Sequence, residues 1–424
     1  MKAWLLSVFW LLWPVAAVCA DATAITNARI YTLAGTNQPI ERGSLLIENG
    51  RIAAVGSDIV LPADARRIDA AGGIVTPGLF AAASQLGLIE NSSNDHSSDA
   101  SLQSGGLGAG FDIQYAVNPN SLLIELARAD GFTRAATLPG DSAVAPFGGL
   151  AALLRLGPGS DLLERPQSAV VARIGGPSAD SAGGSRAAQW QLLSVALNQA
   201  RHWTAPGEDA ATGLDDLNSG ALAAVLRGDI PLLLEVRRES DIRQAIRLKD
   251  EFDIGIVILG GSEAWRAADA LAAAGIPVIL DAAANLPGNV DEWGARGDAA
   301  RLLQEAGVLV ALYAGGALHY SLNAGLGARE SAGLAVANGL PWIEALRALT
   351  VNPARIWQLD AAADGLVEGS AADLVVWDGD PLEPSSYPSH VFVGGREVSL
   401  ETRQTRLRDR YLPAHRDAWP PAYH

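Results

Sequence analysis

Apolar and polar residues alternate in short runs near the start of the chain. Between residues 22 and 76 this pattern predicts a series of strands, because alternation with a period of two is typical of half-buried β-structure. Asn49-Gly50 separates two of these runs and predicts a hairpin, since a type I′ turn needs positive φ at both central positions. The expected strands are Ala24–Leu33, Gly43–Glu48, Arg51–Val55 and Arg67–Ile68.

The pattern changes near residue 225 to continuous apolar runs separated by amphipathic segments. Such runs predict parallel strands that are buried on both faces and connected by helices. Repeats at this spacing indicate a TIM-like (β/α)8 barrel, whose site would lie at the C-terminal strand ends. The expected strands are Ile230–Val236, Ile254–Leu259, Ile276–Asp281 and Val308–Tyr313, and the expected helices span 240–253, 262–275 and 298–306.

β-character returns after residue 369, with expected strands at Ala372–Trp377, Val391–Val393 and Arg396–Val398. We expect these strands to join those of the N-terminal segment in one small, discontinuous β-sandwich domain. The fold class is therefore α/β, a barrel plus this composite domain. The expected divisions are a signal peptide over 1–20, the composite β-sandwich domain over 22–76 and 359–400, the barrel over 77–358 and an Arg-rich tail over 401–424. The tail is expected to be helical, with its arginines facing solvent or the acidic body.

The first twenty residues have the features of a secretory signal. Lys2 precedes an apolar stretch that is short for a membrane span, and small residues at Val18 and Ala20 suit cleavage before Asp21. A lipoprotein signal is the alternative, but it needs a residue smaller than valine just before Cys19, where Val18 stands. We therefore expect an exported protein, periplasmic or secreted, with no membrane span after cleavage. Removal of Cys19, the only cysteine, would leave no thiolate and no disulfide.

The composition narrows the class of protein. Hydrophobic residues make up 49% of the chain and charged residues 18%, which excludes general disorder. The formal net charge of −16 argues against a nucleic-acid partner, because phosphate binding needs a clustered basic surface.

Three stretches resemble the amidohydrolase superfamily, most closely its imidazolonepropionase-like members. They occur in the family's order and spacing, and cover both ends of the chain and the end of the barrel. They are 43–52 (GSLLIENGRI) with 75–79 (VTPGL), 335–341 (AVANGLP) with 344–346 (EAL) and 350–354 (TVNPA), and 369–381 (GSAADLVVWDGDP). The resemblance implies a barrel with a composite β-domain, and hydrolysis of C–N bonds in cyclic amide or peptide-like substrates. It also implies zinc or another divalent metal as the usual cofactor.

The positions that hold the metal in this family carry other residues here. The family ends its first barrel strand with His-x-His, and places further ligands at the ends of later strands. The residues at the corresponding positions of this chain are Ala83, Gln85, Glu235, Gly260 and Gly315. Alanine and glycine offer no ligand atom, and an amide is a poor ligand for a transition metal. We therefore predict that the metal centre is degenerate and that no metal cofactor is bound.

Neither lysine nor histidine supplies an evident replacement for these ligands. Family members often bridge metals with a lysine or glutamate, yet Lys249 is the only lysine after the expected leader, and its setting predicts a surface position on a helix. The six histidines show no pair at ligand spacing; they are His96, His202, His319, His390, His415 and His424.

Three residues remain as weak catalytic candidates. Glu235 and Asp281 both end expected strands and could meet Arg237 at the barrel mouth, where two carboxylates can act as acid and base. The alternative is that Glu235 and Arg237 pair across a defunct site. Two functions stay open: a C–N hydrolase, or an inactive homologue that binds a small molecule at the mouth or stabilises a partner. That partner could be an active relative or a second copy of the chain.

Overall fold

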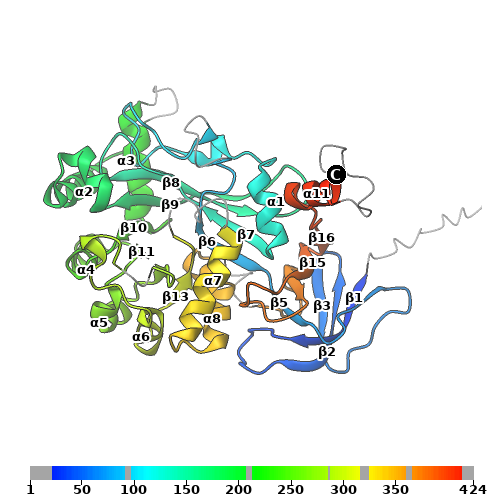
Figure 1. The fold of residues 1–424 in the computed structure, drawn as a ribbon. Helices are drawn as coiled ribbons and strands as arrows, with labels where there is room; N and C mark the ends of the chain where they lie inside the picture. The colour runs from blue at the N-terminus through cyan, green and yellow to red at the C-terminus, as the bar shows by residue number, and fades with distance from the viewer. Residues whose placement is uncertain are drawn as a thin grey trace, which may run out of the picture.

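The computed structural model describes residues 22–90, 97–206, 213–284, 287–315, 324–359 and 365–412. The expected signal peptide lies outside these residues. The described chain contains two eight-stranded sheets, which lie side by side in Figure 1. Within these residues no helix is both long enough and apolar enough to cross a membrane.

The first sheet is built from both ends of the chain. Its order is β16-β15-β14-β5-β1-β2-β3, and β4 pairs with β1. The two ends meet where β14 runs antiparallel to β5, with Val375 opposite Thr76. This sheet supports, in part, the predicted composite β-domain. Its strands are β1 (Thr23–Ile30), β2 (Ile40–Glu48), β3 (Arg51–Gly56), β4 (Arg66–Asp69), β5 (Ile74–Pro77), β14 (Leu374–Trp377), β15 (Pro388–Val393) and β16 (Arg396–Glu397).

The predicted Asn49-Gly50 hairpin is confirmed. β2 and β3 pair antiparallel with Glu48 opposite Arg51, and φ is +51° at Asn49 and +78° at Gly50. Both values lie in the left-handed region, which asparagine and glycine adopt more readily than other residues.

The second sheet forms a nearly closed barrel, in the order β13-β12-β11-β10-β9-β8-β7-β6. Seven of its strands share one direction, as expected, but β8 runs antiparallel to both β7 and β9. The barrel therefore departs from a regular (β/α)8 repeat. Its strands are β6 (Leu79–Ser84), β7 (Phe132–Thr137), β8 (Phe147–Arg155), β9 (Leu163–Arg173), β10 (Leu232–Val236), β11 (Ile256–Gly260), β12 (Val278–Leu280) and β13 (Val310–Leu312).

Short connections explain the reversed strand. Residues 138–146 link β7 to β8, and residues 156–162 link β8 to β9. A parallel neighbour needs a crossover of about a dozen residues or more, whereas an antiparallel neighbour needs only a hairpin. β8 must therefore run back along β7.

The barrel interior is filled by side chains from all eight strands, and α9 (Val351–Ile356) completes its wall between β6 and β13. On the β6 side, the Phe80 N–H donates to the Leu349 carbonyl at 2.8 Å, and the Trp357 indole donates to the Ala82 carbonyl at 3.0 Å. On the β13 side, the Asn352 amide donates to the Val310 carbonyl at 2.8 Å. This segment thereby satisfies edge groups of both strands.

The remaining helices lie outside the barrel or connect it to the first sheet (Figure 1). Two boundaries differ from expectation: α4 begins at Glu239, before the expected cap Ser240, and the 262–275 segment begins as a 3-10 turn, Ala264–Ala267. The helices are α1 (Leu122–Ala129), α2 (Arg186–Arg201), α3 (Leu214–Leu226), α4 (Glu239–Phe252), α5 (Ala268–Ala274), α6 (Ala299–Glu305), α7 (Ala324–Ala337), α8 (Trp342–Ala348) and α11 (Arg403–Tyr411).

A buried ion cluster joins the N-terminal end of the barrel to the first sheet. Asp373, 6% exposed, lies 2.5 Å from Arg134 and 2.8 Å from Arg155, and accepts the Gly394 N–H. Burial acts to raise the pKa of Asp373, but the two guanidinium groups outweigh it and lower that pKa. Arg134 also pairs with Glu164 at 2.9 Å.

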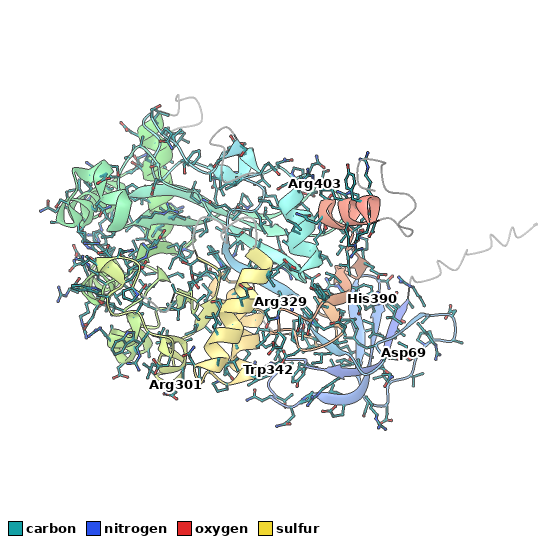
Figure 2. All side chains as sticks on the ribbon, viewed as in Figure 1. Asp69, Arg301, Arg329, Trp342, His390 and Arg403 are labelled. Carbon is teal, nitrogen blue, oxygen red and sulfur yellow. The ribbon has the colours of Figure 1, made fainter. Side chains whose placement is uncertain are left out.

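A second buried arginine makes a similar connection. Figure 2 shows Arg329 on α7 directed toward the C-terminal segment. Arg329 is 1% exposed, and its guanidinium lies 4.9 Å from the Trp377 ring centre. It donates to the carbonyls of Pro381, Glu383 and Ser386 at 2.7 Å each.

The Arg-rich tail begins with the expected helix. α11 has no buried residue, and Arg406 pairs with Glu125 of α1 at 3.0 Å. The rest of the tail, 413–424, lies outside the described residues.

Candidate functional site at the barrel mouth

The residues at the family's ligand positions all lie at the C-terminal ends of barrel strands. Ala83 is buried in β6 and Gln85 follows that strand. Glu235 lies in β10, and Gly260 ends β11 with φ at +90°. Gly315 follows β13. The structure therefore gathers these positions at one end of the barrel, as parallel strands require.

Glu235 is held between two arginines at this mouth. Its carboxylate pairs with Arg173 at 2.9 Å and with Arg237 at 3.2 Å. Arg173 also donates to the carbonyls of Pro139 and Gly140, each at 2.6 Å. Glu235 and Arg237 therefore do meet, and their pairing is part of a larger arrangement.

That arrangement continues across the mouth as a network of ion pairs. Arg237 pairs with Glu292 at 3.0 Å, and Arg238 pairs with Asp291 at 2.6 Å. Arg186 contacts Asp291 and lies 3.3 Å from Asp241. Burial acts to lower the pKa of Arg237, but nearby acidic groups, Glu235 first, raise it overall. The mouth network contains four arginines and five carboxylates, and Asp141 joins it at 3.8 Å from Arg173. Its members are Arg173, Arg186, Arg237, Arg238, Asp141, Glu235, Asp241, Asp291 and Glu292.

Sequence reasoning missed most of this network. Arg173 ends β9 just as Glu235 ends the neighbouring β10, and the two are paired in register. Recognising the apolar run 169–172 as a buried strand could have identified Arg173. Asp291 and Glu292 come from the 3-10 turn Val290–Glu292, whose position over the mouth carries no evident pattern in sequence.

Asp281 lies beside Gly315. Its carboxylate accepts the backbone N–H groups of Ala283 and Gly315, both at 2.9 Å. Burial raises the pKa of Asp281, although these donors act in the opposite direction. A Cβ at position 315 would lie 2.5 Å from the Asp281 Oδ2. Asp281 therefore occupies space that any side chain at position 315 would need.

The described residues do not fit a family-type metal centre. Within the ranges given above, no three His, Cys, Asp or Glu side chains are arranged to hold a metal ion. His390 lies in the first sheet, where its Nδ1 is 2.6 Å from Glu397, and His202 follows α2. His96, His319, His415 and His424 lie outside the described residues.

Comparison with known proteins gives the class of the chain. The amidohydrolase family model matches residues 295–398. An amidohydrolase from Thermotoga maritima MSB8 is 26% identical with a TM-score of 0.80, covering 89% of this chain and 99% of its own. The chain therefore belongs to the amidohydrolase superfamily. A search of functionally curated proteins finds no match.

More distant structures share only the fold. N-isopropylammelide isopropylaminohydrolase from Burkholderia multivorans ATCC 17616 is 18% identical with a TM-score of 0.51, covering 89% of this chain and 98% of its own. A mutant atrazine chlorohydrolase from Arthrobacter aurescens TC1, solved with zinc and atraton, is 16% identical with a TM-score of 0.51. It covers 92% of this chain and 98% of its own. Both names describe cleavage reactions on their own substrates.

Proposed function

We propose that this protein is a non-hydrolytic member of the amidohydrolase superfamily that works by binding, either to a small molecule or to a partner protein such as an active relative. The observation that carries the proposal is the mouth network, in which Glu235 is held between Arg173 and Arg237. Glu235 lies where the family resemblance places a metal ligand. Carboxylates that are already paired with arginines are poor donors for a cation, because metal binding would leave partly buried guanidinium groups uncompensated.

Gly315 supports the same proposal. The family resemblance places at this position an aspartate that binds metal and activates water. Here the Gly315 N–H donates to Asp281, and Asp281 takes up the space of the missing side chain. The local packing is therefore adapted to glycine.

Metal-free hydrolysis by Glu235 and Asp281 is the second candidate. It is favoured by the opposite environments of the two groups: Glu235 contacts two arginines, whereas burial raises the pKa of Asp281. Such a difference suits a general base and a general acid. Against it, Asp281 accepts two backbone hydrogen bonds and lies 3.5 Å from the Ser331 hydroxyl, which gives it a structural role.

Metal analysis of the purified mature protein tests the first proposal. After incubation with excess zinc and dialysis, we expect substoichiometric zinc and no chelator-sensitive hydrolysis of cyclic imides or dipeptides. Stoichiometric zinc together with hydrolysis that a chelator abolishes would overturn the proposal.

Two isosteric variants test the second candidate. A metal-independent hydrolysis that Glu235→Gln and Asp281→Asn each abolish would establish acid–base catalysis. Glu292→Gln is the matched control, since it removes another carboxylate from the same network. Equal loss in all three variants would indicate a folding effect and reject the acid–base assignment.

Export and partner choice are further parts of the proposal. The N-terminal sequence supports a periplasmic or secreted location, which cell fractionation and N-terminal sequencing of the mature chain would test. Co-purification with a relative that carries His-x-His would support a partner-stabilising role over small-molecule binding.

A further inference from the structure

Lys249, which the sequence predicts to lie at the surface of a helix, borders a surface hollow. It is half-buried on α4 and lines a hollow of about 330 Å³ at the opposite end of the barrel from the mouth network. Residues at the entry to three strands form part of the lining, among them Gly255, Pro277 and Leu309. We propose that this hollow binds a monoanionic amphiphile, of the class of a medium-chain fatty carboxylate.

The walls of the hollow suit an apolar body. Its lining contains the branched side chains of Ile256, Leu271, Ile276, Val308 and Ile356. Its exposed lining is predominantly apolar, and its volume falls within the range of about 300–1,000 Å³ that is typical of small-molecule pockets. An apolar chain placed there would be removed from water at roughly 0.8 kcal/mol per buried methylene.

The charges of the hollow suit an anionic head group. Among the described residues, Lys249 and Arg355 are the only charged ones that line it, and none of the lining residues described is a carboxylate. Neither head group has a hydrogen bond or an ion pair within the described ranges, whereas the arginines of the mouth network are paired. The chain carries 47 acidic and 31 basic residues, so a hollow whose described charged lining residues are both basic is a local exception. A carboxylate would accept charge-assisted hydrogen bonds from both head groups.

A third basic residue, Arg165, lies at this end of the barrel. Arg165 donates to the carbonyl of Gln358, which also lines the hollow, at 3.3 Å. Arg355 in addition borders a second hollow of about 420 Å³, which shares the wall 307–309. The second hollow contains the paired Glu344 and Arg347. The head group therefore belongs near Arg355, and the tail belongs in the apolar hollow.

Other ligand classes fit less well. A sugar or a free phosphate would leave the apolar wall uncovered, and a cationic amphiphile would face two positive charges. The proposal concerns residues remote from the barrel mouth, so it holds whether or not that mouth is catalytic.

Calorimetric titration of the full mature chain with dodecanoate tests the assignment. We expect saturable binding of one molecule per chain. Lys249→Gln and Arg355→Gln should each weaken it roughly five- to tenfold, because each removes one charge-assisted hydrogen bond. Ala272→Phe, which places a ring in the lining, should abolish binding by filling the hollow.

The matched control is Arg247→Gln, which removes an exposed positive charge from the same helix without touching the lining. Its affinity should equal that of the wild type, and dodecyltrimethylammonium should not bind. Absence of saturable dodecanoate binding would overturn the proposal. The proposal would also fail if Arg247→Gln weakened binding as much as the lining variants do. It would fail as well if Lys249→Gln and Arg355→Gln both bound dodecanoate as tightly as wild type, with unchanged melting temperatures.

Discussion

Replacement of Asp373 by asparagine should weaken the connection between the barrel and the first sheet. Asp373 is 6% exposed and faces two guanidinium groups, at 2.5 Å from Arg134 and 2.8 Å from Arg155. Removing one partner of a buried ion pair typically costs about 3–5 kcal/mol, because the remaining charge stays buried. Arg134 retains Glu164 in the variant, and the asparagine oxygen can still accept the Gly394 N–H. We therefore expect a loss near the lower limit, about 3 kcal/mol at pH 7.

The loss should also depend on pH. The two arginines hold the pKa of Asp373 below its ordinary value of 3.8 in the folded chain. The carboxylate therefore contributes its full stability above the unfolded pKa, and that contribution declines as pH falls through the lower folded value. The difference between wild type and Asp373→Asn should be constant near neutrality and shrink below about pH 4.

Urea unfolding followed by circular dichroism, repeated from pH 7 downward, measures both effects. Glu164→Gln is the control: it removes a carboxylate from the same Arg134, but its side chain is 23% exposed. We expect it to cost about 1 kcal/mol, since solvent screens more exposed pairs. A loss below roughly 1 kcal/mol for Asp373→Asn, or one that stays unchanged at the lowest pH where both proteins fold, would refute the reasoning.

Three further substitutions give separable predictions. Gly315→Asp restores the family residue but should lower the melting temperature, because its Cβ would lie 2.5 Å from the Asp281 Oδ2, and it should not confer zinc binding. The double variant Gly315→Asp with Asp281→Gly should recover much of the lost stability. Asp130→Asn should stabilise the fold at neutral pH by up to about 3 kcal/mol, since burial raises the pKa of Asp130 to about 6. The ionised form of Asp130 is disfavoured in the folded chain, so wild-type stability declines as pH rises from about 4 to 6. In urea titrations, the greater stability of Asp130→Asn over wild type should therefore disappear below about pH 4. Arg329→Met should cost about 3 kcal/mol or more in the same assay, because the carbonyls of the 381–386 segment lose their buried donors; a change below about 1 kcal/mol would contradict this role.

Several local features were predictable because they depend on neighbouring residues. Asn49-Gly50 forms the expected hairpin, since its positive φ values are an intrinsic preference of those residue types. The strands β10 to β13 follow the expected alternation of apolar runs, with ends that differ by one or a few residues. The composite sheet was expected from the β-character of both ends of the chain, but the pairing of residues 76 and 375 is not a local property and was not itself predicted.

The reversal of β8 was not predicted. Its residues are buried along nearly the whole strand, so their pattern does not distinguish a parallel from an antiparallel neighbour. Direction depends on the length of the connections, and these can be measured only after the strands have been located. Sequence reasoning placed no strand between 85 and 229, which left the connections undefined.

The sequence by itself determined which residues occupy the family's ligand positions, because side-chain identity there fixes what each position can donate. It also determined the alternation of strands and helices in the second half of the chain. Only the tertiary structure decided that Glu235 lies between Arg173 and Arg237, and that Asp281 fills the space beside Gly315. It likewise placed Lys249 and Arg355 around one hollow. These contacts join residues far apart in sequence, and their partners are selected by packing and by the cost of burying an uncompensated charge, which no local pattern encodes.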